Sequence, residues 1–191
     1  MHRAVFLDRD GTIIEEVGYL SHISQVRLYP WSAAAIRRLN QAGLKVVMTT
    51  NQSGIGRGFF PPALVEETHE KLRNDLALSG AFLDGIYYCP HHPEAAIEAY
   101  RVRCDCRKPE PGLLLRAAQD LNLDLAGSYV VGDKYTDVQL AFSVGARAVL
   151  VLTGYGRGEW EEKRAAGDRA PDFLAETLAD ASEWIVQQSR L

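Results

Sequence analysis

The chain has 191 residues, 47% of them hydrophobic, and a formal net charge of -4 at pH 7. This length and apolar content are sufficient for one well-buried domain, and the acidic balance provides no electrostatic footprint for nucleic acid. No apolar span is long enough for a transmembrane helix, and the apolar run near Met1 is too short for a signal peptide. We therefore expect residues 1–191 to form a single domain of a cytoplasmic, monomeric protein that binds neither nucleic acid nor membrane.

The first predicted strand, Ala4–Leu7, is a short apolar run that leads into Asp8 and Asp10 before Gly11. Two carboxylates so close repel each other unless a cation or a shared proton lies between them. A strand that delivers acids at its carboxyl end is typical of the site-bearing edge of an open α/β sheet. The plainer interpretation is a strand end followed by solvated acids in a turn.

Strands and helices alternate along the rest of the chain, which predicts a parallel sheet with right-handed crossovers. The further strands are expected at 44–50, 84–88, 128–132 and 147–152, with a short strand or turn at 171–174. The helices are expected at 31–42, 61–79, 112–121, 138–144 and 177–188. The polar segment 12–29 is expected to be a loop, and the polar segment 154–170 is assigned no element. We expect His69 at the surface or half-buried on its helix, and Trp184 facing inward.

Polar residues gather where three of the predicted strands end. Asp8–Asp10, Thr50–Asn51 and Asp133–Asp137 follow strands whose carboxyl ends share one edge of a parallel sheet. The loop 51–58 is rich in glycine and small donors, as a phosphate cradle is, although an ordinary loop is the commoner explanation.

These residue types favour phosphoryl chemistry. Asp8 and Asp133 supply hard oxygen ligands that suit Mg²⁺, and Lys108 supplies a mobile positive charge for a phosphate oxygen. A divalent cation, a cationic side chain and converging donors make a phosphoryl site. Because the chain lacks a Walker A motif, a nucleotide-binding P-loop is disfavoured.

All three cysteines lie in one segment that also contains two histidines. In a reducing compartment such a cluster favours a metal over disulfides. The pairs Cys89-x-His91 and Cys104-x-Cys106 can close a tetrahedral site around Zn²⁺ with no open position, so the ion would be structural. His91 is preferred because its spacing matches that of the cysteine pair, but His92 stays open. The alternative is three reduced thiols without metal. Bound zinc would order the loop that carries the phosphate-binding lysine.

Four motifs in chain order resemble those of the haloacid dehalogenase-type phosphatases: Asp8-x-Asp10-Gly11-Thr12, Thr50, Lys108 and Gly132-Asp133-x-x-x-Asp137. The resemblance implies a three-layer, Rossmann-like α/β fold with helices on both faces of the sheet. It also implies that Asp8 attacks phosphorus to form an aspartyl-phosphate, while Asp10 protonates the leaving alkoxide and then activates water. Thr50 and Lys108 would hold the phosphoryl oxygens. Mg²⁺ would lie between Asp8, the backbone carbonyl of Asp10, and Asp133.

Three stretches, 47–55, 89–93 and 104–109, are similar to a narrower group within the histidinol-phosphate phosphatase-like family, the D-glycero-D-manno-heptose 1,7-bisphosphate 7-phosphatases. This resemblance implies removal of the 7-phosphate in nucleotide-activated heptose (lipopolysaccharide core) biosynthesis. The implied catalytic residues are Asp8, Asp10, Thr50 and Lys108. The implied substrate-binding residues are Glu16, Val17, Gly18, Tyr19, Thr50, Asn51, Gln52, Ser53, Arg107, Lys108 and Lys134. The implied metal ligands are Asp8, Asp10 and Asp133 for Mg²⁺, and Cys89, His91, Cys104 and Cys106 for Zn²⁺.

No long insertion follows Thr12, and only the zinc-binding loop at about 89–109 separates the third and fourth strands. We therefore expect no separate cap domain and an open cleft that admits an extended sugar bisphosphate. A histidinol-phosphate phosphatase shares the acid motif and the zinc loop, and stays open as an alternative. A polynucleotide 3'-phosphatase is disfavoured by the acidic charge. A zinc-stabilised binding module is disfavoured by the intact acids. The sequence leaves the preferred anomer undecided.

Overall fold

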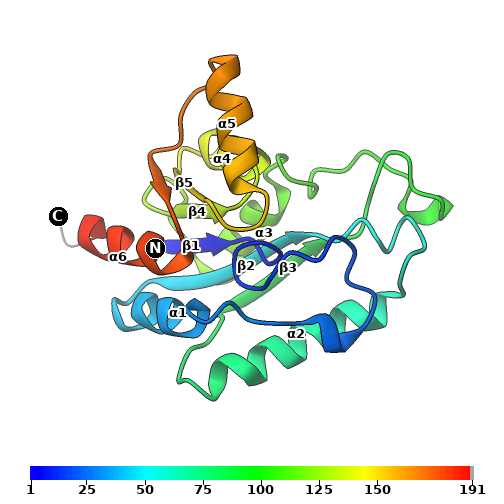
Figure 1. Cartoon of the computed structure of the whole chain (residues 1–191), viewed down its shortest axis with the longest axis horizontal. Helices are drawn as coiled ribbons and strands as arrows, with labels where there is room; N and C mark the ends of the chain where they lie inside the picture. The colour runs from blue at the N-terminus through cyan, green and yellow to red at the C-terminus, as the bar shows by residue number, and fades with distance from the viewer. Residues whose placement is uncertain (190–191) are drawn as a thin grey trace.

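Six parallel strands form one sheet through the centre of the computed structural model, which describes residues 1–189 (Figure 1). The strands are β1 (Ala4–Leu7), β2 (Lys45–Asn51), β3 (Gly85–Cys89), β4 (Tyr129–Gly132), β5 (Arg147–Val151) and β6 (Phe173–Ala175). Their order across the sheet is β3-β2-β1-β4-β5-β6, and every neighbouring pair is parallel. The order therefore reverses between β1 and β4. In such sheets ligands bind in the crevice outside the carboxyl ends of these two strands.

Helices cover both faces of the sheet (Figure 1). They are α1 (Ser32–Gln41), α2 (Pro62–Ala77), α3 (Gly112–Leu121), α4 (Tyr135–Ser143), α5 (Gly156–Ala166) and α6 (Leu178–Ser189). α1, α2 and α6 pack with Val5 and Leu7 of β1. α3, α4 and α5 pack on the opposite face with Ala4 and Phe6, because successive side chains of a strand point to opposite faces. The three-layer α/β fold expected from the sequence is confirmed.

The two inner strands β1 and β4 are buried at every residue. Both faces of these strands are covered by helices, so both faces must be apolar. This explains why they are recognisable in the sequence as continuous hydrophobic runs rather than as alternating patterns.

One helix, α5, occupies the polar segment to which the sequence assigned no element. Its sequence GRGEWEEKRAA is rich in good helix formers, and it ends at Gly167, whose φ of 78° is left-handed. Gly156 is its only fully buried residue. Because the helix has no broad apolar stripe, hydrophobic periodicity could not reveal it.

The expectation that His69 lies at the surface or is half-buried is wrong, because its exposed fraction is 2%. The residue lies on α2 at helical spacing from the buried Leu72 and Leu76. Its ring makes an edge contact with Tyr88 of β3, with the ring centroids 5.6 Å apart. By contrast Trp184 faces inward as expected and stacks on Phe173 at a centroid distance of 4.8 Å.

Two connections pass over the carboxyl edge of the sheet. Within residues 1–189, the connection from β1 to α1 holds only the short 3-10 turn η1 (Ile23–Gln25), and that from β3 to α3 holds only η2 (Glu98–Tyr100) and the cysteine loop. The described chain therefore has no folded cap, as expected. None of its helices combines the length and apolar character needed to cross a membrane.

Candidate active site

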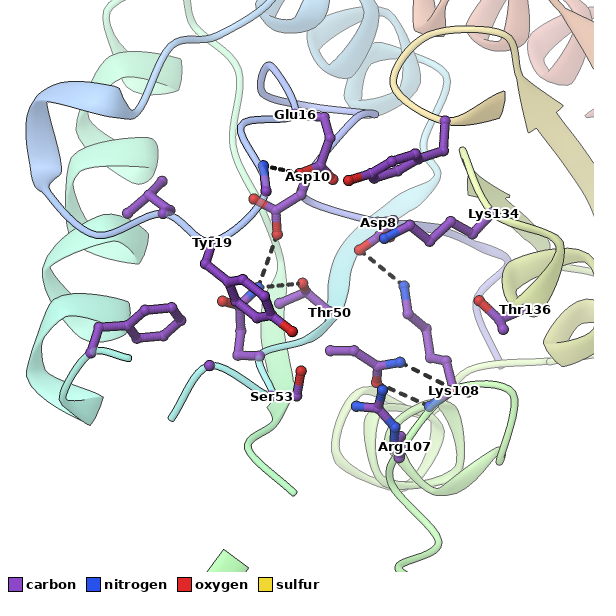
Figure 2. Close-up of a pocket in the computed structure, with 17 residues that line it drawn as sticks. Asp8, Asp10, Glu16, Tyr19, Thr50, Ser53, Arg107, Lys108, Lys134 and Thr136 are labelled. Carbon is purple, nitrogen blue, oxygen red and sulfur yellow. Dashed lines mark hydrogen bonds and ion pairs between the residues drawn. The ribbon is translucent and has the colours of Figure 1, made fainter. Parts of the chain in front are cut away.

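A cleft of about 310 Å³ opens at the carboxyl edge of the sheet (Figure 2). Every residue proposed from the sequence to bind substrate lines it except Val17, together with Asp8 and Asp10. The carboxylate of Glu16 accepts a hydrogen bond of 2.6 Å from the backbone N–H of Gly18. This turn keeps Glu16 and Gly18 on the cleft side, whereas Val17 between them lies outside and is 40% exposed.

Asp8 follows β1 and forms an ion pair with Lys108. The Lys108 ammonium lies 2.9 Å from Oδ1 of Asp8 and 2.7 Å from Oδ1 of Asp137, and it donates to the Thr49 carbonyl at 3.0 Å. Burial would lower the pKa of Lys108, but the charges of Asp137 and Asp8 outweigh it and raise the pKa above its ordinary value. The lysine is therefore charged and its position is fixed.

Asn51 fixes the backbone of the lysine. Its side-chain amide donates to the Lys108 carbonyl at 3.1 Å, and its side-chain oxygen accepts from the Lys108 N–H at 3.0 Å. The end of β2 is thereby joined to a residue 57 positions along the chain. Asn51 thus lines the cleft and also holds the loop that carries the cation.

Asp133 follows β4 and is fully buried. Its Oδ2 accepts from the N–H of Tyr155 at 2.8 Å, whereas its Oδ1 has no hydrogen-bond partner within residues 1–189. Two glycines enclose it, since a Cβ on Gly11 would lie 2.0 Å, and one on Gly154 2.2 Å, from Oδ2. Both glycines have positive φ, 76° and 55°, which other residues adopt only with strain.

Three acids form a cluster in which one carboxylate oxygen of each lies within 4.8 Å of the others: Asp8, Asp133 and Asp137. Burial and the charge of Asp8 raise the pKa of Asp133 to about 8, and burial raises that of Asp137 to about 6 although Lys108 opposes the shift. One buried ammonium cannot balance three carboxylates, so ionising all three would leave an excess of negative charge, and this repulsion is one cause of the raised pKa values. The unpartnered Oδ1 of Asp133 and this charge fit a divalent cation with oxygen ligands.

The side chain of Asp10 does not belong to this cluster. Its Oδ2 accepts a hydrogen bond of 2.9 Å from Nε2 of Gln52, and both of its oxygens contact Arg9. The same Gln52 nitrogen donates to Oγ1 of Thr50 at 2.9 Å, and Figure 2 shows Asp10 and Thr50 joined through these bonds. Because the Thr50 oxygen already accepts this bond, its own hydrogen is available for an acceptor in the cleft.

Charged and aromatic side chains surround the mouth of the cleft (Figure 2). Burial and the charge of Asp10 raise the pKa of Glu16. The Lys134 ammonium lies 4.5 Å from the centroid of the Tyr155 ring, a cation–π contact. Tyr19 makes an edge contact with the exposed Phe59, at a centroid distance of 4.7 Å. On the other side, Arg107 donates to the His91 carbonyl at 3.2 Å, which ties it to the cysteine loop.

The second cluster joins Cys89, His91, Cys104 and Cys106, whose ligand atoms all lie within 4.8 Å of one another. The sulfur–sulfur distances are 3.1 to 3.5 Å, and Nδ1 of His91 lies 3.3 Å from the Cys106 sulfur and 3.7 Å from that of Cys89. Ligands of one tetrahedral zinc would be separated by roughly 3.5–3.8 Å. This donor set therefore fits Zn²⁺.

The neighbouring residue His92 contacts residues outside the cysteine cluster. Nε2 of His92 lies 2.9 Å from Nη2 of Arg57, and its Nδ1 accepts from the N–H of Glu94 at 3.0 Å. The arrangement therefore favours His91 over His92 as the fourth ligand of the cysteine cluster.

Four residues that line the cleft were not singled out from the sequence: Leu20, Phe60, Thr136 and Tyr155. Leu20 and Thr136 are neighbours of proposed site residues, so adjacency could have suggested them. Tyr155 belongs to the polar segment without a motif, and only the packing of that segment against Asp133 brings it to the cleft.

The chain is similar to known phosphatases. A haloacid dehalogenase (HAD) hydrolase-like family model matches residues 105–181. The D-glycero-beta-D-manno-heptose-1,7-bisphosphate 7-phosphatase of Escherichia coli K12 is 43% identical over 189 residues, which cover 98% of this chain and 95% of that protein. The D-glycero-D-manno-heptose-1,7-bisphosphate 7-phosphatase of Thermosynechococcus vestitus is 44% identical over 186 residues, covering 95% and 94%.

A similar solved structure is that of the D,D-heptose 1,7-bisphosphate phosphatase from B. bronchiseptica, complexed with magnesium and phosphate. It has a TM-score of 0.85 and 35% identity, and the match covers 97% of this chain and 99% of that chain.

Proposed function

The chain belongs to the D-glycero-D-manno-heptose-1,7-bisphosphate 7-phosphatase family, and from this premise we propose that it hydrolyses the 7-phosphate of a D-glycero-D-manno-heptose 1,7-bisphosphate. The product would be the heptose 1-phosphate, which retains the phosphate needed for nucleotide activation in lipopolysaccharide core biosynthesis. The observation that carries the proposal is the meeting of Asp8 and Lys108 at the cleft, with the buried Asp133 directly beside Asp8.

Asp8 acts as the nucleophile in this proposal. Its carboxylate attacks phosphorus as the bond to the sugar oxygen breaks, which leaves an aspartyl-phosphate. Asp10 gives its proton to the departing alkoxide, then takes a proton from the water that hydrolyses the aspartyl-phosphate. These steps regenerate Asp8 and release inorganic phosphate. Thr50 and Lys108 bind the phosphoryl oxygens, and the fixed ammonium needs no reorganisation during the reaction.

Asp8, Asp133 and the backbone carbonyl of Asp10 would hold Mg²⁺. When bound, the ion supplies charge stabilisation for the phosphoryl oxygens and offsets the repulsion among the buried carboxylates. Asp137 would support the site through Lys108, with which it forms an ion pair of 2.7 Å. Cys89, His91, Cys104 and Cys106 would hold a structural Zn²⁺.

The rim of the cleft would select the sugar. Arg107 offers a planar, fork-shaped donor for the distal phosphate or for hydroxyl groups. Hydrogen-bonding groups on the other walls come from Glu16, Lys134, Ser53 and Tyr19. Gly18, Gln52 and Asn51 line the same walls. The absence of a folded cap within residues 1–189 supports an extended substrate. The proposal also includes one domain over residues 1–191, a monomer, and a cytoplasmic location in which the cysteines stay reduced.

Comparative turnover tests this function. The purified full chain, supplied with Mg²⁺, should release phosphate from heptose 1,7-bisphosphate with kcat/KM at least about 100-fold higher than from histidinol phosphate, because the site is lined to bind a second phosphate. Phosphorus NMR should show that the 1-phosphate is retained. Both anomers of the heptose bisphosphate should be assayed. A preference for histidinol phosphate, or loss of the 1-phosphate, would overturn the proposal.

A further inference from the structure

Arg9 is a fully buried arginine in the turn that follows Asp8. Its exposed fraction is 2%, and it is among the largest buried side chains. Arg9 does not line the cleft. A buried guanidinium is costly unless charged and hydrogen-bonding partners surround it, so its partners indicate what it does.

The Arg9 guanidinium faces the carboxylate of Asp10. Its Nε lies 3.2 Å from Oδ1 and 3.1 Å from Oδ2 of that carboxylate, and its Nη2 lies 3.0 Å from each. Nη2 also donates to Oε1 of Gln52 at 2.9 Å. Since Gln52 in turn donates to Oδ2 of Asp10, the three side chains form a closed ring of hydrogen bonds around the carboxylate.

The rest of the molecule holds Arg9 in place. Its carbonyl accepts from the N–H groups of Ile13 and Ile14 at 2.9 and 3.0 Å, and its own N–H donates to Oδ1 of Asp8 at 2.7 Å. His69 on α2 lies close enough to Arg9 that burial and the charge of Arg9 together lower the pKa of His69 to about 3. The guanidinium is therefore enclosed by the protein and held at a fixed position.

We propose that Arg9 is a positioning residue for the acid–base step, holding the Asp10 carboxylate, with Gln52, in the orientation that transfers a proton to the leaving oxygen. Asp10 keeps 17% of its side chain exposed and would rotate freely without the ring. Proton transfer depends on the donor lying within hydrogen-bond reach of the acceptor. This inference rests on the proposed acid–base role of Asp10.

Two substrates with different leaving groups can distinguish a positioning role of Arg9 from a purely structural one. A sugar alkoxide needs a proton as it departs, whereas p-nitrophenolate is a stable anion and needs little help. Loss of positioning should therefore lower kcat/KM selectively for the heptose bisphosphate. General damage to the cleft, or a smaller folded fraction, would lower kcat/KM for both substrates alike.

The experiment measures kcat/KM for both substrates in the wild type, Arg9→Met, Arg9→Lys, Asp10→Asn and the Arg9→Met/Asp10→Asn double variant. Arg9→Met should lose about 100-fold on the heptose bisphosphate and about fivefold or less on p-nitrophenyl phosphate. Arg9→Lys should lie between, because an ammonium keeps the charge but not the fork. In the Asp10→Asn background, Arg9→Met should change kcat/KM by less than about threefold.

The control is Arg38→Met, which removes a half-buried arginine that binds Ser182 and Glu183 far from the cleft. This variant should keep the wild-type kcat/KM for both substrates. If Arg9→Met does not fold, Arg9→Lys and Gln52→Met make the same comparison. Equal losses on both substrates, or additive losses in the double variant, would overturn the proposal.

Failure of the proposed function gives a different result. A wild type that hydrolyses glycerol 3-phosphate but not the heptose bisphosphate would refute the proposed function. Glycerol 3-phosphate would then replace the heptose bisphosphate as the substrate with an alkoxide leaving group in the test of Arg9.

Discussion

Asp8 and Asp10 are separated by one residue, yet their carboxylates lie in different surroundings. Asp8 faces the Lys108 ammonium and the other acids of the buried cluster. Asp10 faces Arg9 and Gln52 on the other side of the turn. Environments that separate two carboxylates in this way allow one to act as nucleophile and the other to exchange protons.

Asp8→Asn should lower kcat for phosphate release at least about 1,000-fold, because an amide cannot form the aspartyl-phosphate. The melting temperature should not fall, since the Asp8 charge is one of the causes that raise the pKa of Asp133 and its removal relieves repulsion. Phosphate release and thermal unfolding should be measured on the same preparation. Near-normal turnover in a folded variant would contradict the nucleophilic role.

The loop between β3 and α3 combines two sites in one element. It carries three of the four predicted zinc ligands, the fourth being Cys89 at the end of β3, and then, two residues after Cys106, the lysine that pairs with Asp8. Arg107 lies between them and donates to the His91 carbonyl. An ordered cysteine cluster should therefore order the cationic wall of the cleft as well.

The wild type should contain one zinc per chain by elemental analysis, and Cys106→Ser should lose it and unfold at a lower temperature, because a four-ligand site would stabilise the loop. Turnover should fall with it, since Lys108 lies two residues away. The matched pair His91→Ala and His92→Ala is the control: the first should lose zinc and the second should keep it, because His92 contacts Arg57 instead. Zinc retained in Cys106→Ser, or lost in His92→Ala, would argue against this ligand set.

At the scale of the whole molecule, the parallel sheet brings distant segments to one edge. Asp8 follows β1, Asn51 ends β2 and Asp133 follows β4, and the parallel pairing of these strands makes their ends adjacent. The helix layers exclude water from the floor of the site, and so the carboxylates and Lys108 interact strongly there. The termini of the described chain lie together at the opposite edge, where Arg3 donates to the Ser189 carbonyl at 2.8 Å.

The buried His69 makes global stability depend on pH. Burial and the charges of Arg9 and Arg73 lower its pKa to about 3 in the folded protein, whereas an unfolded histidine has a pKa of about 6.5. Between these values the unfolded chain binds a proton that the folded protein does not. The free energy of unfolding therefore falls as pH decreases from about 6.5 toward 3, by at most about 1.4 kcal/mol per pH unit from this group.

His69→Phe keeps a ring against Tyr88 and removes this titration. Between pH 7.5 and pH 5 the wild type should lose up to about 2 kcal/mol more stability than the variant, measured by urea unfolding at both pH values. His2→Gln, at an exposed position near the N-terminus, is the control and should behave as the wild type does. Identical losses in the wild type and His69→Phe would contradict the buried, neutral state of His69.

Local chemistry in the sequence is sufficient to predict the strands and most of the residues that line the cleft. Short apolar runs identified β1, β2, β4 and β5, because strands covered on both faces must be hydrophobic throughout. Acids, a lysine and cysteines at strand ends identified both clusters, since their residue types and spacing limit the chemistry available to them. The family resemblance then suggested substrate-binding positions, all of which line the cleft except Val17.

Only the tertiary structure decided which distant groups meet. The burial of His69, the formation of α5 and the entry of Tyr155 into the cleft depend on packing between elements, and none has a local signature. The same holds for the buried pairing of Arg9 with Asp10 and Gln52. A sequence specifies which side chains are charged or apolar, but their burial and partners depend on how the sheet and helices enclose them.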